Sequence, residues 1–94
     1  MTNDQINKAI ALELGWKPHP KSDNHWVLPD GSFTVLKFHV CHNAVAEMRK
    51  AIKGRVEWEL FLRYIWDQGI GLSLDATPLQ QCKAFLKMRG KWRE

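Results

Sequence analysis

The sequence lacks several features that would assign a function directly. Its 94 residues contain two cysteines, Cys41 and Cys82, with no CxxC pair of the kind that binds zinc. No apolar run approaches the length of a membrane-spanning helix. The segment Gly69-Ile70-Gly71 lacks the length and the lysine of a phosphate-binding loop. These absences argue against a zinc knuckle, a membrane protein and a P-loop NTPase.

The start of the chain gives no sign of export. Residues 1–4 are polar and no secretory apolar segment follows them. We therefore expect a cytoplasmic protein in which both cysteines are reduced thiols, with a Cys41–Cys82 disulfide as the alternative. The length and the apolar content of 45% are those of one globular domain, which we assign to residues 1–94.

Tryptophan and positive charge are what the sequence has in excess. The chain has 14 Lys and Arg against 10 Asp and Glu, a net charge of +4, which favours anionic partners. Each tryptophan brings a large apolar area and one N–H group. We expect some of them to complete a small core and others to face a ligand or a second subunit. The five are Trp16, Trp26, Trp58, Trp66 and Trp92.

Local signals outline the first half of the chain. Thr2 and Gln5 have the spacing of a capping box, and Gly15 is suited to end the helix that they begin. Residues 17–25 have loop composition. The turn residues 29–31, Pro-Asp-Gly, lie between two apolar runs and predict a β-hairpin. Its predicted strands are residues 25–28 and 32–36.

The second and third predicted helices differ in character. Asn43 is a plausible N-cap for the second helix and Gly54 can end it. The next segment, Val56 to Trp66, is apolar on nearly every side of a helical wheel. Such a helix must be buried on two sides, which makes it either the central element or a subunit interface. We assign self-association to Trp58, Phe61, Leu62, Ile65 and Trp66.

Two points in the second half stay open at the level of sequence. Residues 56–60 also alternate like a strand, although Phe61-Leu62 breaks that alternation and favours a helix. Residues 69–75 fit a short third strand or an extended linker. The last helix is clearer, because Thr77, Pro78 and Gln80 form an N-terminal signature and Gly90 can end it. Its predicted buried face is Leu79, Cys82, Phe85 and Leu86.

Taken together, these elements predict an α+β fold. Its order is helix, hairpin, helix, helix, helix, with a small hairpin or three-stranded sheet packed between helical layers. In the order and spacing of several short segments the sequence also resembles the phage ABA-sandwich domain family. At the amino end they are residues 3–11 and 14–16, followed by Trp26 and residues 29–31. Further along they are Trp58, Phe61 and Ile65, and at the carboxyl end residues 76–80, 82–86 and 90–92.

The resemblance spans nearly the whole chain and implies a small phage-encoded domain with a sheet between helical layers. It supplies no catalytic residues. The sequence departs from the family pattern at Gln81, which stands in place of an Arg, and at residues 37–42, which replace a more acidic, proline-containing segment. The first change weakens any anion site built there, and the second indicates a locally altered surface.

The sequence offers little support for metal binding or for thiol chemistry. His39, Cys41 and His42 lie close in sequence, but His-x-Cys-His is not a usual zinc spacing. Cys41 has histidines nearby without an evident third group to orient them, and Cys82 falls at a core-facing helical position. We therefore expect no metal, no cofactor and no catalytic residues.

The basic tail is the candidate binding site. Basic groups pair with phosphate while an aromatic face stacks on a base, so we expect anion or nucleotide binding there. The alternative is that Trp92 locks the tail onto the core. The candidate residues are Lys83, Lys87, Lys91, Trp92 and Arg93.

The expected function depends on two observations: the family resemblance, and the lack of an evident reactive centre in the sequence. A phage protein of this kind would act by stoichiometric binding in the host bacterial cytoplasm during infection, as a counter-defence protein. Its partner would be a host defence protein such as a CRISPR effector, or a nucleotide second messenger that carries the immune signal. We also expect a homo-oligomer. The alternative function is a nucleic-acid-binding phage regulator.

Overall fold

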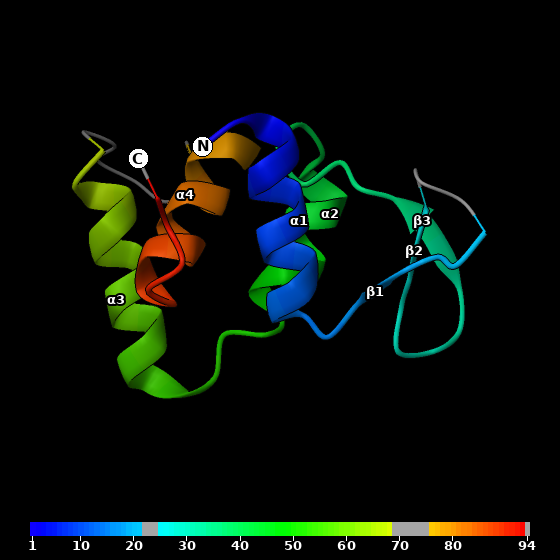
Figure 1. Ribbon diagram of the computed structural model, residues 1–94. Helices are drawn as coiled ribbons and strands as arrows, with labels where there is room; N and C mark the ends of the chain where they lie inside the picture. Colours follow the sequence, from blue (N-terminus) through cyan, green and yellow to red (C-terminus); the bar gives the residue numbers. More distant parts are fainter. Residues whose placement is uncertain (22–24, 69–75, 94) are drawn as a thin grey trace.

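The computed structural model describes residues 1–21, 25–68 and 76–93, which form four helices and a three-stranded antiparallel sheet (Figure 1). The predicted α+β class and the predicted order of helix, hairpin and three further helices are confirmed. The elements are α1 (Asn3–Glu13), β1 (Lys17–Pro18), β2 (His25–Val27), β3 (Phe33–Val35), α2 (His42–Arg49), α3 (Gly54–Trp66) and α4 (Pro78–Met88).

Both predicted capping boxes form. At α1 the Thr2 hydroxyl accepts from the Gln5 N–H at 3.2 Å, and the Gln5 side chain accepts from the Thr2 N–H at 2.9 Å. Thr77 and Gln80 repeat both bonds at α4, with Pro78 at the first helical position. Each box satisfies two N–H groups that the helix itself leaves unpaired.

The sheet has the order β1-β2-β3, and Trp26 of β2 pairs with Thr34 of β3. The loop predicted for residues 17–25 is wrong at Lys17–Pro18, which form the edge strand β1. A proline is tolerated there because an edge strand needs no hydrogen bond on its outer side. The predicted turn is confirmed, with Gly31 at φ +90° and Asp30 accepting from the Ser32 N–H at 2.9 Å.

The two faces of the sheet have different surroundings. Trp26 turns toward the helices and is 6% exposed. Phe33 and Val35 lie on the opposite face and are 62% and 51% exposed. Figure 1 shows the sheet at one end of the molecule beside α1 and α2, with α3 at the other end. The helices therefore carry most of the core.

Two predicted boundaries around α2 are wrong. The helix begins at His42, with extended Cys41 as its N-cap, so Asn43 lies inside the first turn. It ends at Arg49, where tighter hydrogen bonds close the last turn, and Gly54 begins α3 with φ +75° instead of ending α2. The left-handed glycine conformation predicted for a helix end is used here to start the next helix.

Helix α4 is the centre of the helical part, because α1, α2 and α3 all pack against it. Its predicted buried residues Cys82, Phe85 and Leu86 have no exposed area, whereas Leu79 is 40% exposed and was placed there wrongly. Gln81, at 5% exposure, takes the buried position. The wider core joins α1, α2 and α3 through Ile6, Ile10, Val45, Met48, Phe61 and Ile65.

Residues 56–60 are helical, which settles the ambiguity in the sequence. The suggestion that α3 is the central element is wrong, since only Phe61 and Ile65 of this helix are buried. The possible strand at residues 69–75 lies outside the described residues. Both cysteines are free, so the disulfide alternative is excluded. Within the described parts of the chain, no helix is long and apolar enough to cross a membrane.

Candidate functional site

A cavity of about 340 Å³ lies where α2, α3 and α4 meet. Its polar lining consists of His42 and Arg49, the first and last residues of α2, and Gln81 from the first turn of α4. A separation of seven residues is close to two helical turns, so His42 and Arg49 share one face of α2. The apolar lining, all from α3, is Trp58, Phe61, Leu62 and Ile65.

The central polar feature of this cavity is a guanidinium held by a buried amide. Gln81 is 5% exposed, and its amide nitrogen donates to the carbonyl of Ala76 at 3.1 Å. That bond fixes which end of the amide is the acceptor, and the Gln81 oxygen accepts from Nη1 of Arg49. A guanidinium carries five N–H donors, so Arg49 keeps others for a ligand.

Arg49 has no anionic partner in the described part of the chain. The residues described as lining the cavity include no carboxylate, and the ion pairs found among described residues do not involve Arg49. A half-buried charge without a counter-ion is costly unless something compensates it. An anion in the cavity would provide that compensation.

The apolar wall adds an aromatic surface. Trp58 is 39% exposed, and its ring centre lies 5.8 Å from that of Phe61. Phe61 and Ile65 belong to the core and close the inner side. One cation beside an exposed indole suits a ligand that joins an anionic group to a flat ring.

The residues of the predicted tail site occupy different surroundings. Lys91 and Arg93 line a second groove, of about 690 Å³, against α1. Lys83 instead places its Nζ 5.3 Å from the ring centre of Trp92. Lys87 lies in the last turn of α4 and is half-buried. Trp92 packs against the core, which favours the interpretation that it locks the tail.

The cations of this groove already have acidic neighbours. Lys8 pairs with Asp4 at 3.0 Å, and Lys91 lies 3.8 Å from Glu13. Arg93 is exposed at the end of the described tail. An anion entering the groove would compete with these carboxylates, whereas Arg49 offers a guanidinium without such competition.

The residues assigned to self-association divide into two groups. Phe61 and Ile65 are 1% and 2% exposed and belong to the core of the chain itself. Trp58, Leu62 and Trp66 are 39%, 43% and 69% exposed. Only this second group is available to a partner.

The thiols and histidines that the structure describes have different surroundings. The ring of His39 is held by buried Asn7, with 2.9 Å between Nδ1 of His39 and the amide nitrogen. The N–H of Ala44 lowers the pKa of the Cys41 thiol, and burial raises the pKa of Cys82 to about 12. Among the residues described, no three His, Cys, Asp or Glu side chains gather to hold a metal.

Sequence reasoning missed both residues that define the cavity. Arg49 was not assigned to a binding site from the sequence, and Gln81 was noted only as a departure from a family pattern. One signal was present, because Gln81 lies four residues before Phe85 and therefore on the buried side of α4. A polar side chain at such a position needs a hydrogen-bond partner, and here the partner is Arg49.

Comparison of the chain with models of known families, with characterised proteins and with solved structures found no match. The resemblance to the phage ABA-sandwich domain family therefore stays a prediction that depends on the short segments named above.

Proposed function

We propose that this protein acts by stoichiometric binding, and that its ligand is an organic anion of the nucleotide class held in the cavity between α2, α3 and α4. The observation that carries the proposal is Arg49, a half-buried guanidinium that Gln81 orients and that no carboxylate among the described residues neutralises. Phosphate oxygens match the planar donors of arginine, and the Trp58 indole offers a stacking face for a base.

The proposed setting comes from the phage-like resemblance. A phage protein that captures a nucleotide would remove an immune signal from the host cytoplasm, which is a counter-defence role without catalysis. Capping a host immune protein such as a CRISPR effector is the other form of that role. The exposed apolar residues of α3 support an interaction with another protein chain and also support self-association.

Calorimetric titration tests the proposed ligand class. The probes are inorganic phosphate, adenosine, AMP and a cyclic dinucleotide. We expect AMP or the cyclic dinucleotide to bind with a stoichiometry of about one per chain or per two chains, and adenosine to bind much more weakly. Arg49→Gln should weaken binding by about tenfold or more, because hydrogen bonds to charged groups contribute about 1.5–3 kcal/mol.

Lys17→Gln is the matched control. It removes one positive charge from exposed strand β1, away from the cavity, and should leave binding unchanged. Circular dichroism of both variants verifies that the fold is intact. Failure of all four probes to bind, or equal affinity for wild type and Arg49→Gln, would contradict the proposal.

A nucleic-acid-binding role is the second candidate, and the basic lining of the α1 groove favours it. Lys8, Lys91 and Arg93 line that groove. Adding a single-stranded oligonucleotide to the same titrations separates the two functions. Oligonucleotide affinity that falls steeply with salt and depends on Lys91 and Arg93, with no effect of Arg49→Gln, would favour this second function.

A further inference from the structure

The cavity between α2, α3 and α4 contains one permanent positive charge. Arg49 is the only Lys or Arg among the residues that the structure describes as lining it. The remaining parts of the chain, residues 22–24, 69–75 and 94, contain no Lys or Arg, so they bring no further cation to its walls. His42 also lines the cavity, but it is exposed, and water and salt screen a charge at that position.

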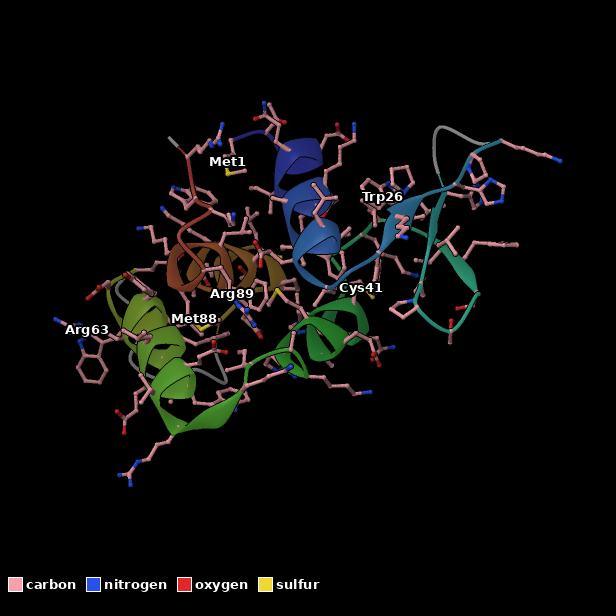
Figure 2. The ribbon with its side chains drawn as sticks, turned by 60° about the horizontal axis from the view of Figure 1, so that its bottom comes forward. Met1, Trp26, Cys41, Arg63, Met88 and Arg89 are labelled. Atoms are coloured by element: carbon pink, nitrogen blue, oxygen red, sulfur yellow. The ribbon has the colours of Figure 1, made fainter. Side chains whose placement is uncertain are left out.

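The arginines of α3 and the arginine at the end of α4 are directed elsewhere. Arg55 pairs with Glu59 at 3.0 Å, and both side chains are well exposed. Arg63 points away from α4, toward the outer side of α3 (Figure 2). Arg89, which follows α4, donates through Nη2 to the carbonyl oxygen of Ala51 at 2.6 Å. Arg49 therefore supplies the positive charge of the cavity without help from these side chains.

The helix ends beside the cavity add little net charge. Helix α2 begins at His42 and ends at Arg49, so both ends of its dipole border the cavity and their partial charges have opposite signs. At the start of α4, the capping box of Thr77 and Gln80 already satisfies two N–H groups. The charge that a ligand meets is therefore mainly that of the Arg49 guanidinium.

The size and the lining of the cavity suit one nucleotide unit. Its volume of about 340 Å³ is near the lower end of the about 300–1,000 Å³ that small-molecule pockets enclose. Of the two aromatic residues in the lining, Trp58 is 39% exposed and Phe61 is covered by the core. One guanidinium and one open aromatic face match one phosphate group and one base.

We propose that the cavity selects its ligand by charge, and that it takes a nucleoside phosphodiester, with one negative charge, in preference to a phosphomonoester or a polyphosphate. This inference rests on the nucleotide class proposed above and narrows it. A phosphomonoester carries a charge of about −1.5 to −2 at pH 7, so beside Arg49 it leaves negative charge without a partner in a half-buried site. Attraction to one cation grows in proportion to the ligand charge, whereas the cost of leaving water grows with its square.

Two kinds of molecule carry this phosphodiester group. A 3′,5′-cyclic mononucleotide contains one such unit, and a cyclic dinucleotide contains two. Because the cavity suits one unit, cyclic AMP should bind with a stoichiometry of one per chain, whereas a cyclic dinucleotide should bind one per two chains. Calorimetric titration of both measures these ratios, and the tighter of the two ligands identifies the source of the phosphodiester.

AMP and its phosphate methyl ester test the selection by charge. The two ligands share the base, the ribose and the position of the phosphorus atom, but at pH 8 AMP is a dianion and the ester a monoanion. The ester should bind wild type at least about fivefold more tightly, because AMP leaves one charge uncompensated in the cavity. Calorimetric titration measures both dissociation constants.

A second cation in the cavity should remove this preference. Leu62 lines the cavity and is 43% exposed, so Leu62→Lys places an amine at its wall. We expect this variant to bind AMP at least as tightly as the ester. Leu60→Lys is the matched control, since Leu60 is 36% exposed on the same helix and is not among the residues described as lining the cavity. It should keep the preference of wild type, and circular dichroism verifies the fold of both variants.

The outcomes separate this inference from the proposed function. AMP that binds wild type as tightly as the ester, or more tightly, would overturn selection by charge while leaving a nucleotide site in place. A preference that Leu62→Lys does not change, or that Leu60→Lys changes equally, would overturn it as well, because the effect would then not come from the cavity. If AMP, the ester and both cyclic nucleotides all fail to bind, the proposed function fails together with this inference.

Discussion

Helices α3 and α4 are built from similar proportions of apolar residues but use them differently. Helix α4 buries five of its residues, including Phe85 and Leu86, and contacts each of the other helices. Helix α3 buries Phe61 and Ile65 alone and leaves most of its apolar side chains on the surface. The core of one chain explains the apolar composition of α4, whereas it leaves most of the apolar side chains of α3 uncovered.

The same contrast shows what the sequence could predict. Caps and turns are local, so Thr2, Thr77 and the turn at residues 29–31 were identified correctly from spacing alone. The apolar excess of α3 was also visible in the sequence. Which of its sides would be buried was not visible, because that depends on where α4 packs in three dimensions.

The cavity could not be predicted for a related reason. Arg49 and Gln81 are 32 positions apart, and their hydrogen bond exists only because α2 and α4 pack side by side. The predicted end of α2 was wrong because Gly54 has the backbone conformation typical of a helix end, yet it begins α3.

The largest expected difference between the two helices is in stability. Phe85→Ala should lower the free energy of unfolding by about 3–5 kcal/mol, since it opens a cavity at a fully buried position. Trp66→Ala removes a larger side chain, but at concentrations where the chain is monomeric it should change that free energy by no more than about 0.5 kcal/mol.

Urea denaturation at low protein concentration measures both values. If the exposed apolar residues of α3 mediate the predicted self-association, a repeat at high concentration should reveal a cost for Trp66→Ala, because association then stabilises wild type. A large loss for Trp66→Ala in the dilute monomer would show that Trp66 belongs to the core of the single chain. That result would contradict the difference between α3 and α4 described above.

A smaller effect should appear at alkaline pH on the buried side of α4. Cys82 has its pKa raised by burial from 9.0 to about 12, so the unfolded chain loses this proton at a lower pH than the folded chain. The folded state then binds more protons, and stability falls as the pH rises above about 9. Between pH 9 and 10 the loss from this thiol should be about 1 kcal/mol.

Cys82→Ala provides the comparison, because the two proteins differ only in this side chain and the Cys82 thiol is present only in wild type. The difference in unfolding free energy between the two should shift by that amount across the interval in urea titrations. A difference that does not change with pH would mean that water reaches the Cys82 thiol in the folded protein.

The smallest difference concerns how the two helices begin. Thr77 caps α4 through its hydroxyl, whereas Lys53 at the start of α3 makes no side-chain capping bond. Thr77→Ala should therefore cost about 1 kcal/mol, and Thr77→Ser should restore most of it because serine keeps the hydroxyl. Lys53→Ala should cost little, since its backbone N–H already donates to Glu57 at 2.8 Å. Thermal unfolding of the three variants resolves these values, and an equal loss at Thr77 and Lys53 would show that the α4 cap adds nothing beyond helix propensity.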